Sequence, residues 1–392
     1  MVITVSPDIA LSLLALGALV FVPVSGKLGA VGFLAAGGLL ILRRPATIAA
    51  DCLRYWYIMA LPVYCVMSAL WSQYPPESFR FGAQLIVTVA IAVAIATRLS
   101  PRAFCRALFM LLGIAMLASI AFGNVRNDTG AWLGIFGSKN ALAAAAATFV
   151  IISVAQMIDR RNSARFRGAA LAGAFVGCGI LLAAQSTGAV MSVPPILALL
   201  LALTLMHRLS AVQKAGIVIF AILLAGLIGL LITANYDALV ALLLDKTGKD
   251  MTLTGRTELW EIALDFIRER PLFGMGYQAF WVRGHQPAEA LWFMFGIDSR
   301  GGFNFHNTYL SNAVEIGLVG VTLQVFILYG AAILTGRWAL RTRNADATLL
   351  FGLVMLVVLI SFVEVPVFFQ FSLRTVIILC AFIFAIKARR AT

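Results

Sequence analysis

An arginine and a histidine stand near the two ends of the one long polar stretch of this chain, residues 234–303. Arg256 lies in the run Thr254-Gly255-Arg256-Thr257, and His306 begins the next apolar segment. A guanidinium donates paired N–H bonds to phosphate oxygens, and an imidazole can accept a proton from a hydroxyl nucleophile. We therefore expect the chemistry of the protein in this stretch, with the apolar remainder as its scaffold.

The segment that carries Arg256 is predicted to be a short amphipathic helix over residues 255–270. Thr254 or Gly255 is expected to act as its N-cap, and Pro271 to end it. This places Arg256 in the first turn. The face expected to be buried consists of apolar residues at helical spacing: Leu259, Ile262, Ala263, Phe266 and Ile267.

A cation in the first turn is opposed by the positive end of the helix dipole, whereas an anion would be held there by free backbone amides and the guanidinium together. This favours Arg256 as a pyrophosphate ligand. The alternative is a surface arginine paired with Glu258 or Glu261, and periodicity by itself favours that alternative.

Three further candidates for substrate binding follow His306, namely Asn307, Tyr309 and Glu315. An acid inside an apolar segment is costly unless it is paired or serves a site. The alternative for His306 is a cap at the membrane edge, and for Glu315 a structural hydrogen bond to a neighbouring helix. The nine-residue spacing of His306 and Glu315 predicts no direct contact between them.

Other basic and amide side chains are candidates to complete an anion site. Lys139 and Asn140 open a predicted apolar helix on the same side of the membrane as the polar stretch. Residues 185–188 form a short polar turn between two predicted spans on that same side. Arg283 and Arg300 lie within the polar stretch itself. We expect no metal, because Asp245 and Asp250 beside Lys246 and Lys249 are typical of a solvated turn.

Composition defines the scaffold. The chain has 392 residues, of which 61% are hydrophobic and 12% charged, too little polar surface for a soluble globule of this size. Apolar runs near the 20 or so residues needed to cross a bilayer predict an all-α polytopic membrane protein with about twelve transmembrane helices. The predicted spans are 8–25, 27–42, 55–71, 81–97, 104–122, 140–158, 168–185, 188–206, 215–233, 306–334, 347–366 and 374–386.

Most of the 30 lysines and arginines fall in the connections after even-numbered spans and at the C-terminus. The positive-inside rule then makes both termini cytoplasmic and the polar stretch external. The same rule accounts for the net charge of +13, so nucleic acid is not an expected partner. Three parts result: an N-terminal bundle over 1–233, a catalytic loop over 234–305 and C-terminal helices over 306–392.

The chain resembles the O-antigen ligase and polysaccharide polymerase superfamily of multispan glycosyltransferases. The resemblance rests on the spacing of three motifs and on two weaker ones. The three are Thr254-Gly255-Arg256-Thr257 with Leu259-Trp260, Glu269-Arg270-Pro271-Leu272-Phe273-Gly274-Met275-Gly276, and His306-Asn307-Thr308-Tyr309-Leu310 followed by Glu315-Ile316-Gly317-Leu318-Val319-Gly320. The weaker ones are Trp71-Ser72 with Pro75, and Gly137 with Lys139-Asn140.

The resemblance implies a GT-C-like enzyme without a cofactor at the outer face of a bacterial inner membrane, acting on glycans linked to undecaprenyl pyrophosphate. It implies that Arg256 binds the pyrophosphate and that His306 assists the acceptor hydroxyl. Many relatives carry a basic residue in the short polar turn, but Ser186-Thr187-Gly188 has none here. Lys139, Arg283 or Arg300 is then expected to supply the second positive charge.

Within this superfamily the molecule that accepts the glycan distinguishes a polymerase from a ligase. A polymerase that joins lipid-linked repeat units is favoured, and the similarity of residues 264–274 with Phe280-Trp281 to exopolysaccharide polymerases supports it. A ligase would transfer the glycan to a lipid A core instead. A transporter of lipid-linked glycans is the alternative from another class. The expected partners are the lipid-linked donor, a glycan or glycolipid acceptor and membrane lipids, with a chain-length regulator left open.

Overall fold

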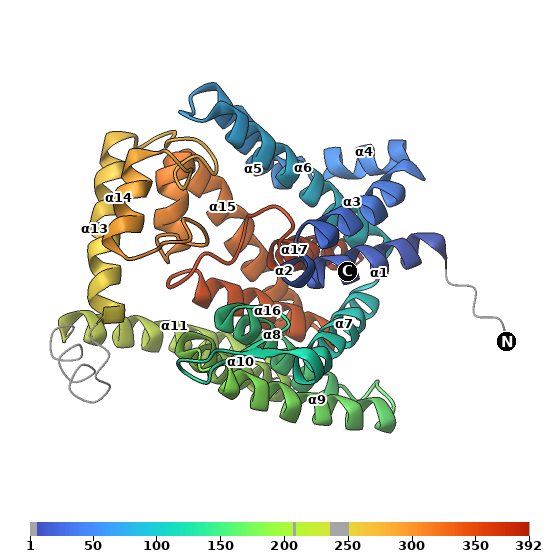
Figure 1. The fold of residues 1–392 in the computed structure, drawn as a ribbon. Helices are drawn as coiled ribbons and strands as arrows, with labels where there is room; N and C mark the ends of the chain where they lie inside the picture. Colours follow the sequence, from blue (N-terminus) through green and yellow to red (C-terminus); the bar gives the residue numbers. More distant parts are fainter. Residues whose placement is uncertain (1–5, 207–208, 236–250, 392) are drawn as a thin grey trace.

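The structure is a computed structural model that describes residues 6–206, 209–235 and 251–391; Asp245 and Asp250, with the turn expected around them, lie outside these ranges. Helices dominate the described chain (Figure 1). The N-terminal helices are α1 (Pro7–Val20), α2 (Val22–Ser25), α3 (Lys27–Leu42), α4 (Pro45–Arg54), α5 (Trp56–Met67), the 3-10 helix η1 (Ser68–Leu70), α6 (Pro75–Arg98) and α7 (Pro101–Phe122).

A small hairpin of β1 (Asn124–Val125) and β2 (Trp132–Gly134) precedes the middle helices. The helices that follow are α8 (Lys139–Ile158), α9 (Ala164–Ala183), α10 (Thr187–Met206), α11 (Ala211–Ala234), α13 (Met251–Glu269), α14 (Gln286–Met294), α15 (Thr308–Arg341), α16 (Ala345–Ile360) and α17 (Leu373–Ala391).

Each of the twelve predicted spans overlaps one helix or a pair of consecutive helices, but the predicted span 347–366 extends beyond α16, which ends at Ile360. Six helices of the described chain are long and apolar enough to cross a membrane: α6, α7, α8, α9, α10 and α15. The pair α3 and α4 passes the same test together but bends by 99° at its break. The chain is thus an all-α multi-pass membrane protein, and the count of twelve spans stays a prediction.

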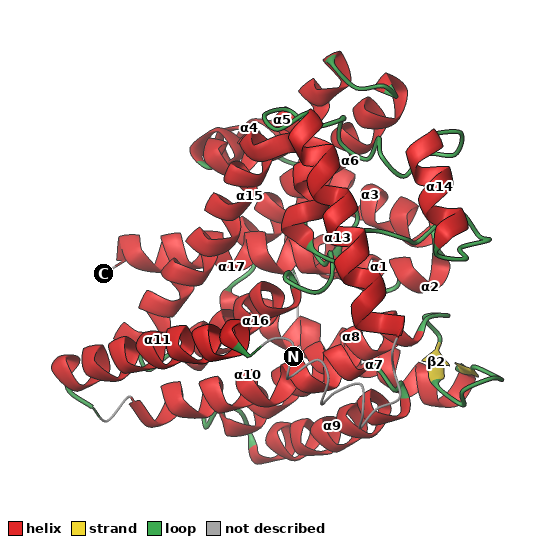
Figure 2. Ribbon diagram, turned by 90° about the vertical axis from the view of Figure 1, so that its left-hand side faces the viewer, coloured by secondary structure: helices red, strands yellow, loops and turns green. Residues whose placement is uncertain are grey.

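The last three long helices connect two ends of the molecule. α15 starts directly after His306 and ends at Arg341, α16 returns from Ala345 to Ile360, and α17 runs back from Leu373 toward Arg390. The segment 361–372 therefore lies at the same end as His306. In Figure 1, α13 and α14 lie at this end and α4 at the opposite one, and Figure 2 shows α13 crossing the front of the bundle.

The turn that follows α13 packs against a break in α15. Gly317 has φ 62°, a left-handed conformation inside the helix. A Cβ on Gly317 would lie 2.3 Å from the Leu272 carbonyl oxygen, so only glycine allows this approach. The two backbones then bond directly: Gly276 N donates to Glu315 O at 2.7 Å, and Leu318 N donates to Pro271 O at 2.8 Å. This contact fixes the segment between α13 and α14 to the bundle.

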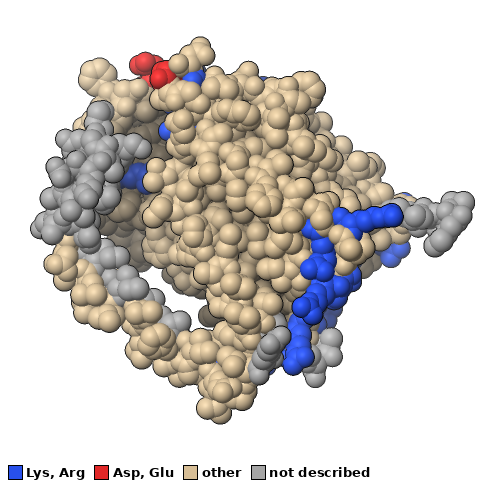
Figure 3. All heavy atoms as spheres, turned by 90° about the horizontal axis from the view of Figure 1, so that it is seen from below, with Lys and Arg blue, Asp and Glu red and all other residues tan. Residues whose placement is uncertain are grey.

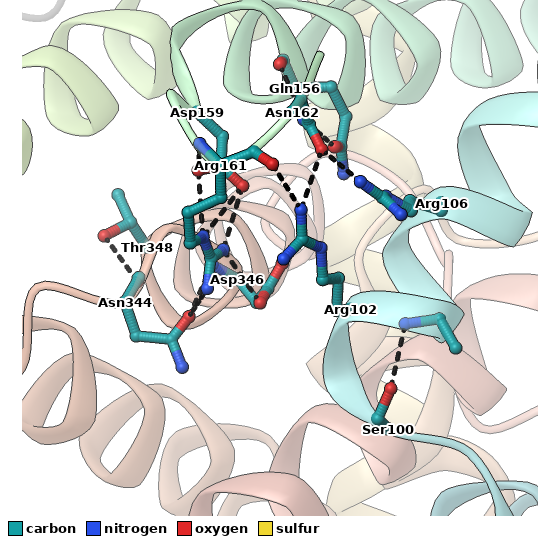
Figure 4. A network of polar contacts seen from close by, with 11 residues as sticks. Ser100, Arg102, Arg106, Gln156, Asp159, Arg161, Asn162, Asn344, Asp346 and Thr348 are labelled. Atoms are coloured by element: carbon teal, nitrogen blue, oxygen red, sulfur yellow. Dashed lines mark hydrogen bonds and ion pairs between the residues drawn. The ribbon is translucent and has the colours of Figure 1, made fainter. Parts of the chain in front are cut away.

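The opposite end is basic and tied by a polar network (Figure 4). Arg161, between α8 and α9, pairs with Asp159 and with Asp346 of α16, each at 2.9 Å. Asn162 accepts from Arg106 of α7 at 2.6 Å. Figure 3 shows lysine and arginine side chains gathered in a band on the side away from α13. The helices are thus locked together at one end by ion pairs and at the other by the turn against α15.

Candidate functional site

A carboxylate joins the arginine and the histidine singled out by the sequence. Glu364, in the segment between α16 and α17, accepts from Arg256 Nη2 at 3.2 Å through Oε1 and contacts His306 Nδ1 at 3.1 Å through Oε2. Arg256 Nη1 also donates to the carbonyl of Val363 at 3.1 Å. Residues from three separate segments therefore form one cluster, Arg256–Glu364–His306, at the end of the bundle.

Arg256 is placed by α13, but not in its first turn. The helix begins at Met251, four residues before the predicted start, so the predicted N-cap at Thr254 or Gly255 is wrong. A single glycine costs a helix only about 1 kcal/mol, and a helix can continue through Gly255. The helix dipole and free amides consequently do not act at Arg256, and its position depends on Glu364 and the Val363 carbonyl instead.

The buried face of α13 is the predicted one. Leu259 and Ala263 are buried, and Ile262, Phe266 and Ile267 pack against the same aromatic cluster as Phe280 and Trp292. The helix ends at Glu269, before Pro271, as predicted. With this face against the aromatic cluster, the neighbouring face carries Arg256 toward Glu364.

His306 is held in a strained backbone conformation. Its φ is 49°, a left-handed value that costs a residue with a side chain free energy unless the surroundings impose it. Its N–H donates to Asn304 Oδ1 at 2.7 Å, and Trp260 Nε1, on α13, donates to the adjacent Phe305 carbonyl at 2.8 Å. The imidazole is thereby fixed against Glu364 by a chain segment that has little freedom to rotate.

The charges and hydrogen bonds of the cluster determine which atoms of Glu364 and His306 carry a proton. Burial raises the pKa of Glu364, but the hydrogen bond with His306 and the charges of His306 and Arg256 outweigh it, so the pKa lies below its ordinary value. An ionised carboxylate can only accept, so the proton of a neutral His306 sits on Nδ1. Its Nε2 then carries a lone pair, the form required of a general base.

The segment that carries Glu364 is anchored to the start of α15. Thr308 N donates to Ser361 O at 2.9 Å, and Thr308 Oγ1 to the Glu364 carbonyl at 2.8 Å. Asn307 caps α15 through Oδ1, and its Nδ2 donates to Phe362 O at 3.2 Å. The amide of Asn307 is thus engaged in positioning Glu364 and His306.

The other predicted residues are not joined to the cluster by hydrogen bonds or ion pairs in the described chain. Tyr309 bonds Tyr329 between their hydroxyls at 2.9 Å. Glu315 is buried and accepts at 3.0 Å from the backbone N of Gln278, in the segment between α13 and α14. The remaining four are placed as follows: Arg300 pairs with Glu289 at 3.1 Å, Asn140 accepts from Ser186 at 3.2 Å, Arg283 is exposed, and Lys139 is half-buried.

Two charged residues of the site escaped the sequence reasoning. Glu364 is absent from the predicted site residues, and its two partners lie 108 and 58 residues away in the sequence. Arg374, at the start of α17, is close enough to Glu364 for their charges to interact. The side chain of Arg374 makes no hydrogen bond or ion pair with any described residue. The sequence did hold one signal for Glu364: an acidic residue near the end of the predicted span 347–366, two residues before Pro366.

The fold and this cluster define a multi-pass helical membrane protein with an arginine–carboxylate–histidine site at one end of its helical bundle. A family model described as O-antigen ligase matches residues 172–325. The chain is similar to the exopolysaccharide production protein ExoQ of Rhizobium meliloti (strain 1021), with 31% identity over 351 residues, 88% of this chain and 80% of the relative. The chain belongs to the O-antigen ligase and polysaccharide polymerase superfamily, in agreement with the resemblance seen in its motifs.

Proposed function

We propose that the protein is a membrane glycosyltransferase that polymerises undecaprenyl-pyrophosphate-linked oligosaccharide repeat units into a surface exopolysaccharide. The observation that carries the proposal is the Arg256–Glu364–His306 cluster, which combines an anion ligand with an oriented base. The relative named for exopolysaccharide production supports the polymer as product. The basic opposite end supports a site on the periplasmic side of the inner membrane and cytoplasmic termini.

In the proposed reaction a hydroxyl of the acceptor sugar attacks the anomeric carbon of the lipid-linked donor. A new glycosidic C–O bond forms, and the bond between that carbon and the pyrophosphate oxygen breaks. The hydroxyl proton passes to His306 Nε2, and undecaprenyl pyrophosphate leaves as the anion. Glu364 keeps the imidazole in the required tautomer and stabilises the imidazolium that forms.

Charge grows on the pyrophosphate as its bond to the sugar breaks, so fixed cations stabilise the transition state more than the ground state. Arg256 is the first such cation in the proposal. We assign Arg374 as the second one, because it opens α17 directly after the segment 361–372 that carries Glu364, its charge interacts with that of Glu364, and its side chain has no hydrogen bond or ion pair in the described chain. Arg300 is less suitable because it pairs with Glu289 at 3.1 Å. Arg283 is exposed and Lys139 opens α8, and neither belongs to a segment that carries a member of the cluster.

Removal of the gene from its host tests the proposed function against the two alternatives. A polymerase deletion should leave single repeat units on the lipid carrier, visible by mass spectrometry of extracted glycolipids. Long lipid-linked chains would instead indicate a ligase, the activity in the description of the matching family. For the transporter, reconstituted protein given donor on one side would relocate it without forming new glycosidic bonds. Running that assay in chelator also tests the proposed independence from metal.

Replacing Arg374 with glutamine is expected to raise the KM for the lipid-linked donor about tenfold, since one of two cations facing the pyrophosphate is lost. The measurement is the initial rate of polymer formation in liposomes at increasing donor concentration. The exposed Arg283, replaced in the same way, serves as the matched control. An unchanged KM in Arg374→Gln would remove Arg374 from the donor site.

A further inference from the structure

Two adjoining hollows lie at the basic end of the molecule, remote from the cluster described above. The larger has a volume of about 500 Å³ and is lined by Tyr57, Phe326, Leu334, Phe382, Ile386, Arg389 and Arg390. The smaller is lined by Leu334, Arg337, Trp338, Arg341, Thr342, Ala385, Ala388 and Arg389. Because Leu334 and Arg389 line both, the two hollows are neighbours between α15 and α17, with α5 closing the larger one.

The position of these hollows follows from the directions of the helices. Arg337 and Arg341 stand in the last turns of α15, and Arg389 and Arg390 in the last turns of α17. Both helices start at the end that carries His306 and Glu364. The hollows therefore open at the opposite membrane boundary and belong to no part of the glycosyl-transfer site.

The walls of the larger hollow are apolar and partly aromatic. Tyr57 packs edge-on against Phe326, with ring centroids 6.3 Å apart, and against Phe382 at 6.0 Å. Phe326 is 54% exposed, so the aromatic wall opens outward instead of being filled by protein. Such a surface suits acyl chains, and tyrosine and tryptophan are the aromatic residues typical of the membrane interface.

The mouth of the hollows is positively charged. All four arginines are exposed, and the lining residues include no acid. The side chains of Arg337, Arg341 and Arg390 form no ion pair or hydrogen bond with any residue in the described ranges. Clustered guanidinium groups beside an apolar wall match a ligand with an anionic phosphate head and hydrocarbon tails.

We propose that these two hollows form a binding site for an anionic phospholipid of the membrane, with its phosphate at the arginines and an acyl chain along Tyr57, Phe326 and Phe382. A bound lipid would join the ends of α15 and α17, the helices whose other ends carry the cluster. The proposal is independent of the glycosyl-transfer function.

The test uses the full chain, purified in detergent, with binding of phosphatidylglycerol measured by native mass spectrometry and phosphatidylcholine as the neutral comparison. The double variant Arg337→Gln/Arg390→Gln should bind phosphatidylglycerol about 30-fold more weakly, since each basic residue near an anionic head group contributes about a factor of five. The matched control, Arg160→Gln/Arg165→Gln, removes the same charge from exposed residues at the same end and should bind like wild type.

A second variant tests the apolar part without changing charge. Ile386→Trp is expected to fill the larger hollow and weaken phosphatidylglycerol binding, while thermal unfolding in detergent shows that the fold is kept. Equal binding of phosphatidylglycerol and phosphatidylcholine, or equal loss in both double variants, would overturn the proposal. The proposal would also be overturned if inorganic phosphate displaced phosphatidylglycerol with an affinity equal to that of the lipid. The apolar wall would then contribute nothing to binding.

Discussion

Replacement of Glu364 by glutamine is expected to lower the rate of polymer formation about 10³-fold, within the range that general-base catalysis contributes. Arg256 can only donate, so it keeps the amide oxygen on its side and turns the amide nitrogen toward His306 Nδ1. Nδ1 must then accept, which moves the imidazole proton to Nε2 and removes the base. The measurement is the turnover of purified protein in liposomes at saturating lipid-linked donor.

The glutamine variant retains the size of the side chain and the contact with Arg256, so donor binding should change little. Glu269→Gln, an exposed acid at the end of α13, is the matched control and should keep wild-type turnover. A Glu364→Gln protein that turns over at more than a tenth of the wild-type rate would show that His306 does not need this carboxylate.

The pH dependence of thermal stability gives a readout that is independent of turnover. The lowered pKa of Glu364 means that its ionised form stabilises the fold above the ordinary value of 4.5, and that this contribution is lost as the pH falls through the lowered folded value. The difference in Tm between wild type and Glu364→Gln should therefore shrink as the pH falls below 4.5.

Replacement of Arg256 by alanine is expected to lower the rate about 10²- to 10³-fold, the effect typical of removing one donor that stabilises developing negative charge. Arg256→Lys should recover only a small part of this loss. A lysine keeps the charge but cannot bond the Val363 carbonyl and Glu364 in the forked geometry of a guanidinium. Rates at increasing donor concentration separate loss of binding from loss of turnover.

Arg268→Ala supplies the matched control for Arg256. Arg268 is on the same helix, pairs with Asp265 and is largely exposed, so its removal should leave the rate unchanged. Inorganic pyrophosphate should inhibit wild type and the Arg268 variant alike, and inhibit Arg256→Ala less. Equal inhibition of all three proteins would contradict the assignment of Arg256 to the pyrophosphate.

The membrane class and the helices were open to prediction because they depend on local sequence. Apolar runs of the right length identified the helices, and the period of Leu259, Ala263 and their neighbours identified the buried face of α13. Arg256 and His306 were recognised by residue type and motif spacing. The start of α13 was predicted wrongly, because a single glycine such as Gly255 is tolerated inside a helix and does not mark where the helix begins.

The sequence by itself determined that this protein is a helical membrane protein of the O-antigen ligase and polymerase type, with its polar residues concentrated in one long stretch. Only the tertiary structure decided that Glu364 joins Arg256 and His306, because the path of the segment 361–372 depends on how α16 and α17 pack against α15. The same holds for the hydrogen bonds of Asn307 to Phe362 and of Glu315 to Gln278. A side chain's partners across 58 or 108 residues are set by packing, and no local pattern encodes them.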